Sequence, residues 1–166
     1  MPVELEVIIR ESLTQFAQEV ARTNWRGRER EAVSLYAFGF LVPWRRPGGI
    51  LHDPSQIGLD VAVGQLPGPN KKKQVCKDLV IWPEPAMVCW DKAGSPTHQP
   101  LAIIEWKVRT KKFSAYDEKW LCDYSSGAPQ FTGYAISLNP QGASTVLMAS
   151  RIVRGVLNSD WLRCPE

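Results

Sequence analysis

Leu101-Ala-Ile-Ile-Glu-Trp-Lys-Val108 is the stretch around which the rest of this chain can be interpreted. Its leading apolar residues predict one strand of a sheet, buried on both faces. Alternate residues of a strand share a face, so Glu105 and Lys107 are expected to project together, with Trp106 on the other side. Charges inside so apolar a strand need a structural or chemical reason.

A second apolar run lies upstream, Val75-Cys-Lys-Asp-Leu-Val-Ile-Trp82, and it carries Asp78. If the two strands are neighbours, Asp78 converges with Glu105 and Lys107. Adjacent carboxylates repel unless a proton or a cation lies between them. Oxygen ligands of this kind suit Mg²⁺, and the lysine can orient a water molecule or stabilise developing negative charge.

Periodicity and punctuation predict the remaining elements. The helices are expected at 3–24, at 28–41 (with a strand over 34–42 as the alternative), and from a cap at Ser114 to about Tyr124. The strands are expected at 57–65, 75–82, 101–108, 131–138 and 144–153, with 88–90 as a strand extension. The first two are expected to form a hairpin, with one apolar face made by Ile57, Leu59, Val61 and Val63, and a short helix is expected in the tail at 156–162.

Asp78, the 26 residues between it and Glu105, and the triplet Glu105-Trp106-Lys107 resemble the catalytic signature of the PD-(D/E)XK nuclease superfamily. The predicted order of elements also resembles that family's αβββαβ core, over roughly residues 28–153. The resemblance implies an α/β fold of the restriction endonuclease type, a central mixed sheet of about five strands flanked by helices. Lys77 stands where the family's name has proline.

The resemblance further implies a metal-dependent nuclease that hydrolyses phosphodiester bonds, with DNA the expected substrate. Asp78 and Glu105 would bind Mg²⁺, for which Mn²⁺ would substitute, with the Trp106 carbonyl as a further ligand. Lys107 would position the attacking water. The family commonly carries one more carboxylate on the helix before the sheet. Either Glu29 or Glu31 fits that place, Glu31 is preferred because it lies deeper in the helix, and a solvated glutamate is the alternative.

The formal net charge of +3 is too small to indicate a nucleic-acid partner by itself, but basic residues gather on a few segments. On the expected fold these segments would flank the carboxylates and hold a phosphate backbone. A solvated hairpin tip is the alternative for the lysine run. The expected backbone contacts are Lys71, Lys72, Lys73, Arg109, Lys111 and Lys112.

A length of 166 residues predicts a single domain over 1–166, and a hydrophobic content of 44% with 22% charged residues is ordinary for a globular protein. The four cysteines form no CxxC pair and the chain has two histidines, which argues against a zinc site. The cysteines are expected to be reduced, which favours a reducing, cytoplasmic location. The sequence contains no apolar run of ~18 residues, so no membrane span is expected. A homodimer is compatible with these bounds.

Two further functions stay open. The chain can be a catalytically inactive nucleic-acid-binding or assembly protein on the same fold. Alternatively, Glu105 and Lys107 can be a structural ion pair on an unrelated α/β domain.

Overall fold

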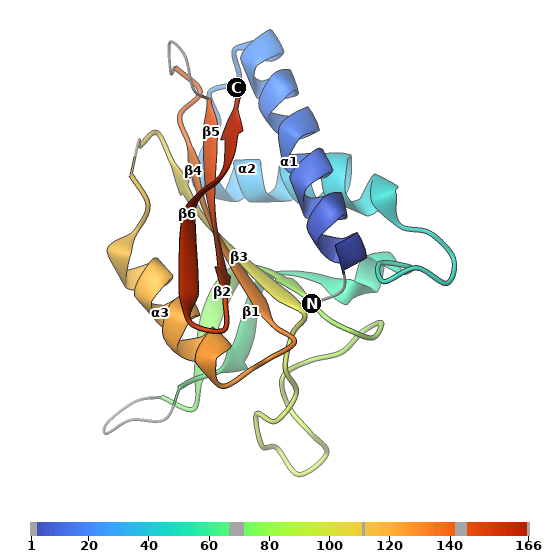
Figure 1. Cartoon of the computed structure of the whole chain (residues 1–166). Helices are drawn as coiled ribbons and strands as arrows, with labels where there is room; N and C mark the ends of the chain where they lie inside the picture. Colours follow the sequence, from blue (N-terminus) through green and yellow to red (C-terminus); the bar gives the residue numbers. More distant parts are fainter. Residues whose placement is uncertain (1–2, 67–71, 111, 142–145, 166) are drawn as a thin grey trace.

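The computed structural model describes residues 3–66, 72–110, 112–141 and 146–165. Within these ranges one open sheet of six strands, ordered β1-β2-β3-β4-β5-β6, is flanked by three α-helices (Figure 1). The elements are α1 (Val3–Thr23), α2 (Glu29–Tyr36), β1 (Ile57–Gly64), β2 (Gln74–Ile81), β3 (Ala102–Val108), α3 (Ala115–Ser126), β4 (Thr132–Leu138), β5 (Leu147–Val153) and β6 (Val156–Cys164). The expected α/β class and mixed sheet are therefore confirmed.

All neighbouring strands are antiparallel except β3 and β4, which run parallel with Glu105 opposite Ala135. Parallel neighbours need a crossover connection, and α3 provides it. The predicted hairpin of β1 and β2 is confirmed, and β2 also pairs with β3, which meets the condition set for Asp78 to lie near Glu105. The Asp78 strand and the Glu105 strand are thus neighbours.

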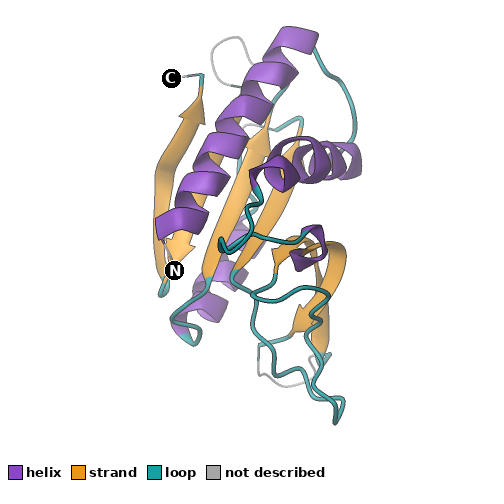
Figure 2. Ribbon diagram, turned by 90° about the vertical axis from the view of Figure 1, so that its right-hand side faces the viewer, coloured by secondary structure: helices purple, strands orange, loops and turns teal. Residues whose placement is uncertain are grey.

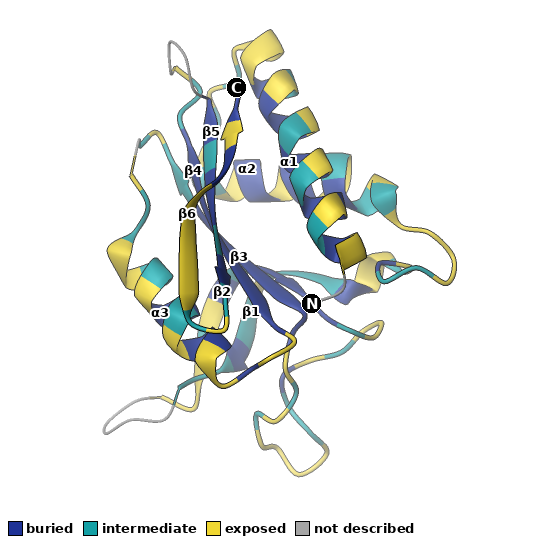
Figure 3. Ribbon diagram, viewed as in Figure 1, coloured by how far each residue is buried: buried dark blue, intermediate teal, exposed yellow. Residues whose placement is uncertain are grey.

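The sheet is the middle of three layers: α1 and α2 cover one face and α3 covers the other (Figure 2). The central strands are the most deeply buried part of the chain, and every residue of β4 is buried (Figure 3).

None of the helices in the described ranges combines the length and apolarity needed to span a bilayer.

Helix α1 confirms the amphipathic pattern predicted for 3–24, because its apolar positions Leu5, Ile9, Leu13, Phe16 and Val20 are all buried. The Phe16 ring packs edge-on against Trp106, with ring centroids 5.6 Å apart. Trp106 is fully buried on this face. That contact fixes which side of β3 faces α1 and so sends Glu105 towards α3.

The predicted tail helix at 156–162 is wrong, because these residues form β6 instead. Arg154 and Gly155 both have positive φ, 52° and 76°, which is the backbone of a tight two-residue hairpin turn. Val153 pairs with Val156 across that turn. The tail therefore folds back onto β5, and the sheet has six strands rather than about five.

Two smaller predictions also need correction. Residues 88–90 lie in a loop and do not extend a strand, although Cys89 is buried there. The alternative strand over 34–42 is also wrong, because α2 continues into a π-helical turn, Ala37–Leu41. The helical interpretation of 28–41 is thus correct, and α2 begins one residue later than expected.

Candidate functional site

Strands β2 and β3 stop pairing next to their acidic residues, Asp78 and Glu105. Their ladder joins Leu79–Ile81 to Ala102–Ile104 and does not extend to Asp78 and Glu105. The two carboxylates bond the backbone groups left over: Asp78 N donates to Glu105 Oε2 (3.3 Å), and Trp106 N donates to Asp78 Oδ2 (2.8 Å). Buried backbone donors need such partners. Asp78 and Glu105 therefore lie side by side where the two strands separate, and each carboxylate accepts a bond from the backbone of the other strand.

The predicted apolar face of β1 is divided in two at Asp60. Ile57 and Leu59 pack against the core beneath α1 and α2, whereas Val61 and Val63 pack into the core beneath α3. Asp60 has φ 52°, which is disfavoured for a residue with a Cβ, and the register with β2 is the same on either side of it. The strand thus changes face at Asp60 through local twist, without an inserted residue.

Strand β2 makes the same change opposite Asp60, at Asp78. Leu79 lies in the core beneath α1 and α2, whereas Val75 packs against the core beneath α3. Lys77 consequently reaches the α3 side, where it meets Glu105, and Asp78 lines a pocket on the α2 side. Strict alternation would have placed Lys77 on the same face as Leu79.

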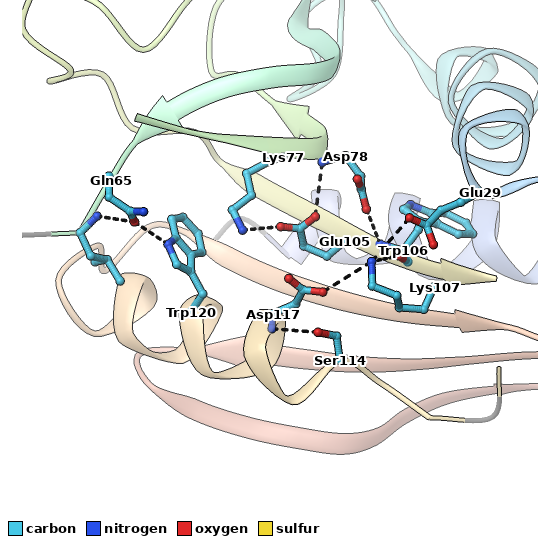
Figure 4. Close-up of polar contacts among 11 residues, drawn as sticks. Glu29, Gln65, Lys77, Asp78, Glu105, Trp106, Lys107, Ser114, Asp117 and Trp120 are labelled. Atoms are coloured by element: carbon cyan, nitrogen blue, oxygen red, sulfur yellow. Dashed lines mark hydrogen bonds and ion pairs between the residues drawn. The ribbon is translucent and has the colours of Figure 1, made fainter. Parts of the chain in front are cut away.

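The lysine paired with Glu105 is Lys77. Its ammonium donates to Glu105 Oε1 and lies 3.8 Å from the centroid of the Trp120 ring (Figure 4). Trp120 Nε1 in turn donates to Gln65 Oε1 at 2.8 Å. Only 3% of Lys77 and 6% of Glu105 is exposed. A charged pair this deeply buried is costly to desolvate and holds its geometry through several partners at once.

Burial raises the pKa of Glu105 to about 7, despite the opposing effect of the Lys77 ammonium. The carboxylates of Asp78 and Asp117 add to the rise, because neighbouring negative charges disfavour ionisation. Glu105 therefore changes protonation near neutral pH when no further cation is present.

Lys107 occupies the open side of the same site (Figure 4). Its Nζ lies 3.5 Å from Glu29 Oε1 and 3.7 Å from Asp117 Oδ2, and it donates to the Trp106 carbonyl at 2.8 Å. Burial alone would lower the pKa of Lys107, but Glu29 and Asp117 raise it above its usual value. The ammonium thus stays charged, and 39% of the side chain is exposed. The Glu105–Lys107 pair considered as an alternative is not formed, since Glu105 pairs with Lys77 instead.

The structure places Glu29 at the site, which corrects the preference for Glu31. The Glu31 carboxylate accepts from Arg28 N at 2.5 Å and so caps the start of α2. Glu29 contacts Lys107 and lines a pocket of about 320 Å³. The pocket's other lining residues are Arg30, Val33, Ser34, Leu59, Asp60 and Asp78.

The carboxylate and carbonyl oxygens gathered here are of the chemical type that a hard divalent cation prefers. No group of three or more His, Cys, Asp or Glu side chains positioned to hold a metal occurs in the described part of the chain. Mg²⁺ does not need one, because it usually keeps several waters and binds through one or two carboxylates. Asp78 Oδ1 has no hydrogen-bond partner among the described residues. The Trp106 carbonyl, another expected ligand, accepts a bond from Lys107.

The net charge of the side chains around the β2–β3 gap and the adjoining pocket is negative. The described residues that line it or pair across it include five carboxylates and three cations. The carboxylates belong to Glu29, Asp60, Asp78, Glu105 and Asp117, and the cations are Arg30, Lys77 and Lys107. A divalent cation would offset the excess.

The residues expected to contact a phosphate backbone are dispersed. Lys72 and Lys73 are exposed just before β2, at the end of the hairpin, and Lys112 is exposed after β3. Arg109 follows β3 directly. The expected contacts Lys71 and Lys111 lie outside the described residues.

Sequence reasoning missed the contributions of Lys77, Asp117 and Trp120. Lys77 carried a signal, because it is a cation next to Asp78 in a strand whose other residues are mostly apolar. No protein-family model matches the chain, and neither does any of the curated proteins or solved structures with which it was compared.

Proposed function

We propose that the chain is a metal-dependent nuclease that hydrolyses phosphodiester bonds, with DNA as its substrate. The observation that carries the proposal is the meeting of Asp78 and Glu105 where β2 and β3 part, with the Lys107 ammonium beside them. Carboxylates on one side and a retained cation on the other are the groups that phosphodiester hydrolysis uses.

Asp78 and Glu105 would hold the cation, Mg²⁺ or Mn²⁺, through their oxygens. The bound ion would supply a lowered pKa for a coordinated water and neutralise charge on the phosphate. Lys107 presents a proton-bearing, positively charged group to the same opening, where it can orient the water or stabilise the developing charge. Glu29 and Asp117 keep Lys107 charged and in place.

One observation favours a second function, nucleic-acid binding without cleavage. Glu105 is already neutralised by a buried lysine, Lys77, so one expected metal ligand has a resident cation. A metal would have to share Glu105 with Lys77 or bind through Asp78 with water. If neither occurs, the site holds no metal, and the exposed basic residues elsewhere on the chain would carry nucleic-acid binding.

Cleavage of circular and linear duplex DNA in the presence of Mg²⁺, Mn²⁺ or EDTA tests the first function against the second. We expect wild-type protein to cut with either metal and not with EDTA. Asp78→Asn should lose about two orders of magnitude or more in rate. Asp123→Asn is a matched control because Asp123 is an exposed carboxylate on α3, paired with Lys119.

Wild-type protein that binds DNA but cuts neither substrate with either metal would reject the nuclease and favour the second function. An Asp78→Asn variant that cuts at the wild-type rate would remove Asp78 from the mechanism. The circular substrate also separates an endonuclease, which opens it, from an exonuclease, which needs an end.

A further inference from the structure

A second hollow with the opposite charge lies next to the carboxylate centre. It has a volume of about 410 Å³ and is lined by Arg26, Arg109, Asn139, Pro140 and Gln141. Among the described residues, its lining contains two guanidinium groups and two amides and no carboxylate. We refer to it as the arginine notch. The pocket beside Asp78, in contrast, is lined by three acidic residues.

Two contacts between the same pair of segments place the notch beside the centre. At one of them, Lys107 meets Glu29 at 3.5 Å. At the other, Arg109 Nη2 donates to the backbone carbonyl of Arg26 at 2.6 Å. The first contact belongs to the carboxylate centre and the second to the notch, and Lys107 and Arg109 are two residues apart at the end of β3. Two residues of extended chain span about 6.6 Å, so the notch lies within reach of a polymer bound at the centre.

Arg109 adopts an unfavourable backbone conformation, which its contacts with neighbouring segments maintain. Its φ is 62°, a value that crowds any residue with a Cβ. The strand pairing continues to this point, since Arg109 N donates to Leu138 O at 2.7 Å. The strand ends just before Arg109, and the Arg109 side chain reaches the backbone of Arg26. Backbone conformations of this kind persist where the surroundings impose them, often at binding sites.

The guanidinium groups of the notch are available to a ligand. No carboxylate lies within ion-pairing distance of Arg26 or Arg109 among the described residues. The bond to the Arg26 carbonyl uses one N–H of Arg109, and a guanidinium has five. The planar fork that is left matches the oxygens of a phosphate, and the neutral amides of Asn139 and Gln141 add donors without charge.

We propose that the arginine notch binds a phosphate group and holds the nucleic-acid backbone next to the bond that the carboxylate centre acts on. The identity of the ligand as nucleic acid rests on the proposed function, whereas the phosphate chemistry rests on the notch alone. A free phosphate compound offers the same chemistry, and the experiment separates the two sources.

The experiment measures binding of a fluorescently labelled DNA duplex in EDTA, by anisotropy over a series of salt concentrations. Cleavage and metal binding play no part under these conditions. The test variant is Arg26→Gln with Arg109→Gln. The control is Arg45→Gln with Arg46→Gln, which removes the same charge from exposed residues in the loop beyond the far end of α2 (Figure 1). Thermal melting should show that both variants are folded.

We expect the Arg26/Arg109 variant to bind duplex about tenfold more weakly than the control. Its salt slope should be shallower by about 1 for each phosphate that the notch no longer neutralises. Calorimetry with inorganic phosphate alone should show heat with wild type and none with this variant. Equal affinity and slope in the two variants would overturn the proposal, even if the protein cuts DNA with Mg²⁺.

Two other results would reject part or all of the proposal. If wild type binds inorganic phosphate through the notch but binds no duplex, the ligand is a free phosphate compound and the nucleic-acid part of the proposal is rejected. If wild type binds neither, the notch is not a phosphate site.

Discussion

Two lysines flank the carboxylate centre, and their surroundings are opposite. Lys77 is 3% exposed, pairs with one carboxylate and is covered by the Trp120 ring. Lys107 has a side chain that is 39% exposed and lies between two carboxylates at the open side. A sealed ammonium stabilises its partner and cannot reach a substrate, whereas an open one can do so. Burial, more than position in a motif, therefore distinguishes a structural lysine from a chemical one.

The largest expected effect is on stability, at Lys77. Lys77→Ala leaves Glu105 buried without its cation, and we expect the free energy of unfolding to fall by about 3–5 kcal/mol. Lys107→Ala removes only partly exposed ion pairs and should cost about 1 kcal/mol or less. Urea unfolding of the two variants at pH 8, where Glu105 is ionised, measures the difference. Similar losses in both would contradict the division between the two lysines.

A second effect on stability depends on pH and comes from Glu105. Its pKa is raised by burial from 4.5 to about 7 in the folded chain, so the folded state holds a proton that the unfolded state releases between these values. The stabilisation is complete below pH 4.5 and is lost as pH rises through 7, on the order of 3 kcal/mol in total.

Glu105→Gln should remove this dependence, because an amide does not titrate. Unfolding followed in metal-free buffer from pH 4.5 to 8 should therefore show a steeper fall for wild type than for the variant. Parallel curves would mean that Lys77 holds Glu105 ionised throughout that range.

The smallest of the three effects in free energy concerns rate. Lys107→Ala should slow DNA cleavage by about a hundredfold, equivalent to about 2.7 kcal/mol of transition-state stabilisation. Its affinity for duplex in EDTA should change little. Lys119→Ala is the matched control, because Lys119 is an exposed lysine on α3 with one carboxylate partner. A Lys107→Ala protein that cuts as fast as wild type would exclude Lys107 from the chemistry.

The sequence was sufficient for features that follow from periodicity. The α1 pattern and the β1–β2 hairpin are both present, whereas the pairing of β2 with β3 that brings Asp78 to Glu105 was only a condition of the sequence argument. The partner of Glu105 was not predictable by the same rule. Alternation places Lys77 on the face of Leu79, and only the face change at Asp60 and Asp78 brings it under Trp120.

Other differences had local signals. Arg154-Gly155 between apolar residues is typical of a hairpin turn, and it indicates β6 where a helix was expected. Glu31 stands at the third position of α2, where a glutamate commonly bonds back to the start of its helix. That position leaves Glu29 for the site. The nuclease resemblance itself depends on Asp78, Glu105 and Lys107, and it stays a prediction.

Calorimetric titration with Mn²⁺ tests the central claim, a cation site at Asp78 and Glu105, most directly. Wild type and Lys107→Ala should bind Mn²⁺ with similar affinity, because Lys107 acts on the reaction and not on the ion. Asp78→Asn should abolish binding, and Glu105→Gln should weaken it strongly. Mn²⁺ binding of equal affinity in wild type, Asp78→Asn and Glu105→Gln would contradict the account, as would the absence of binding to wild type.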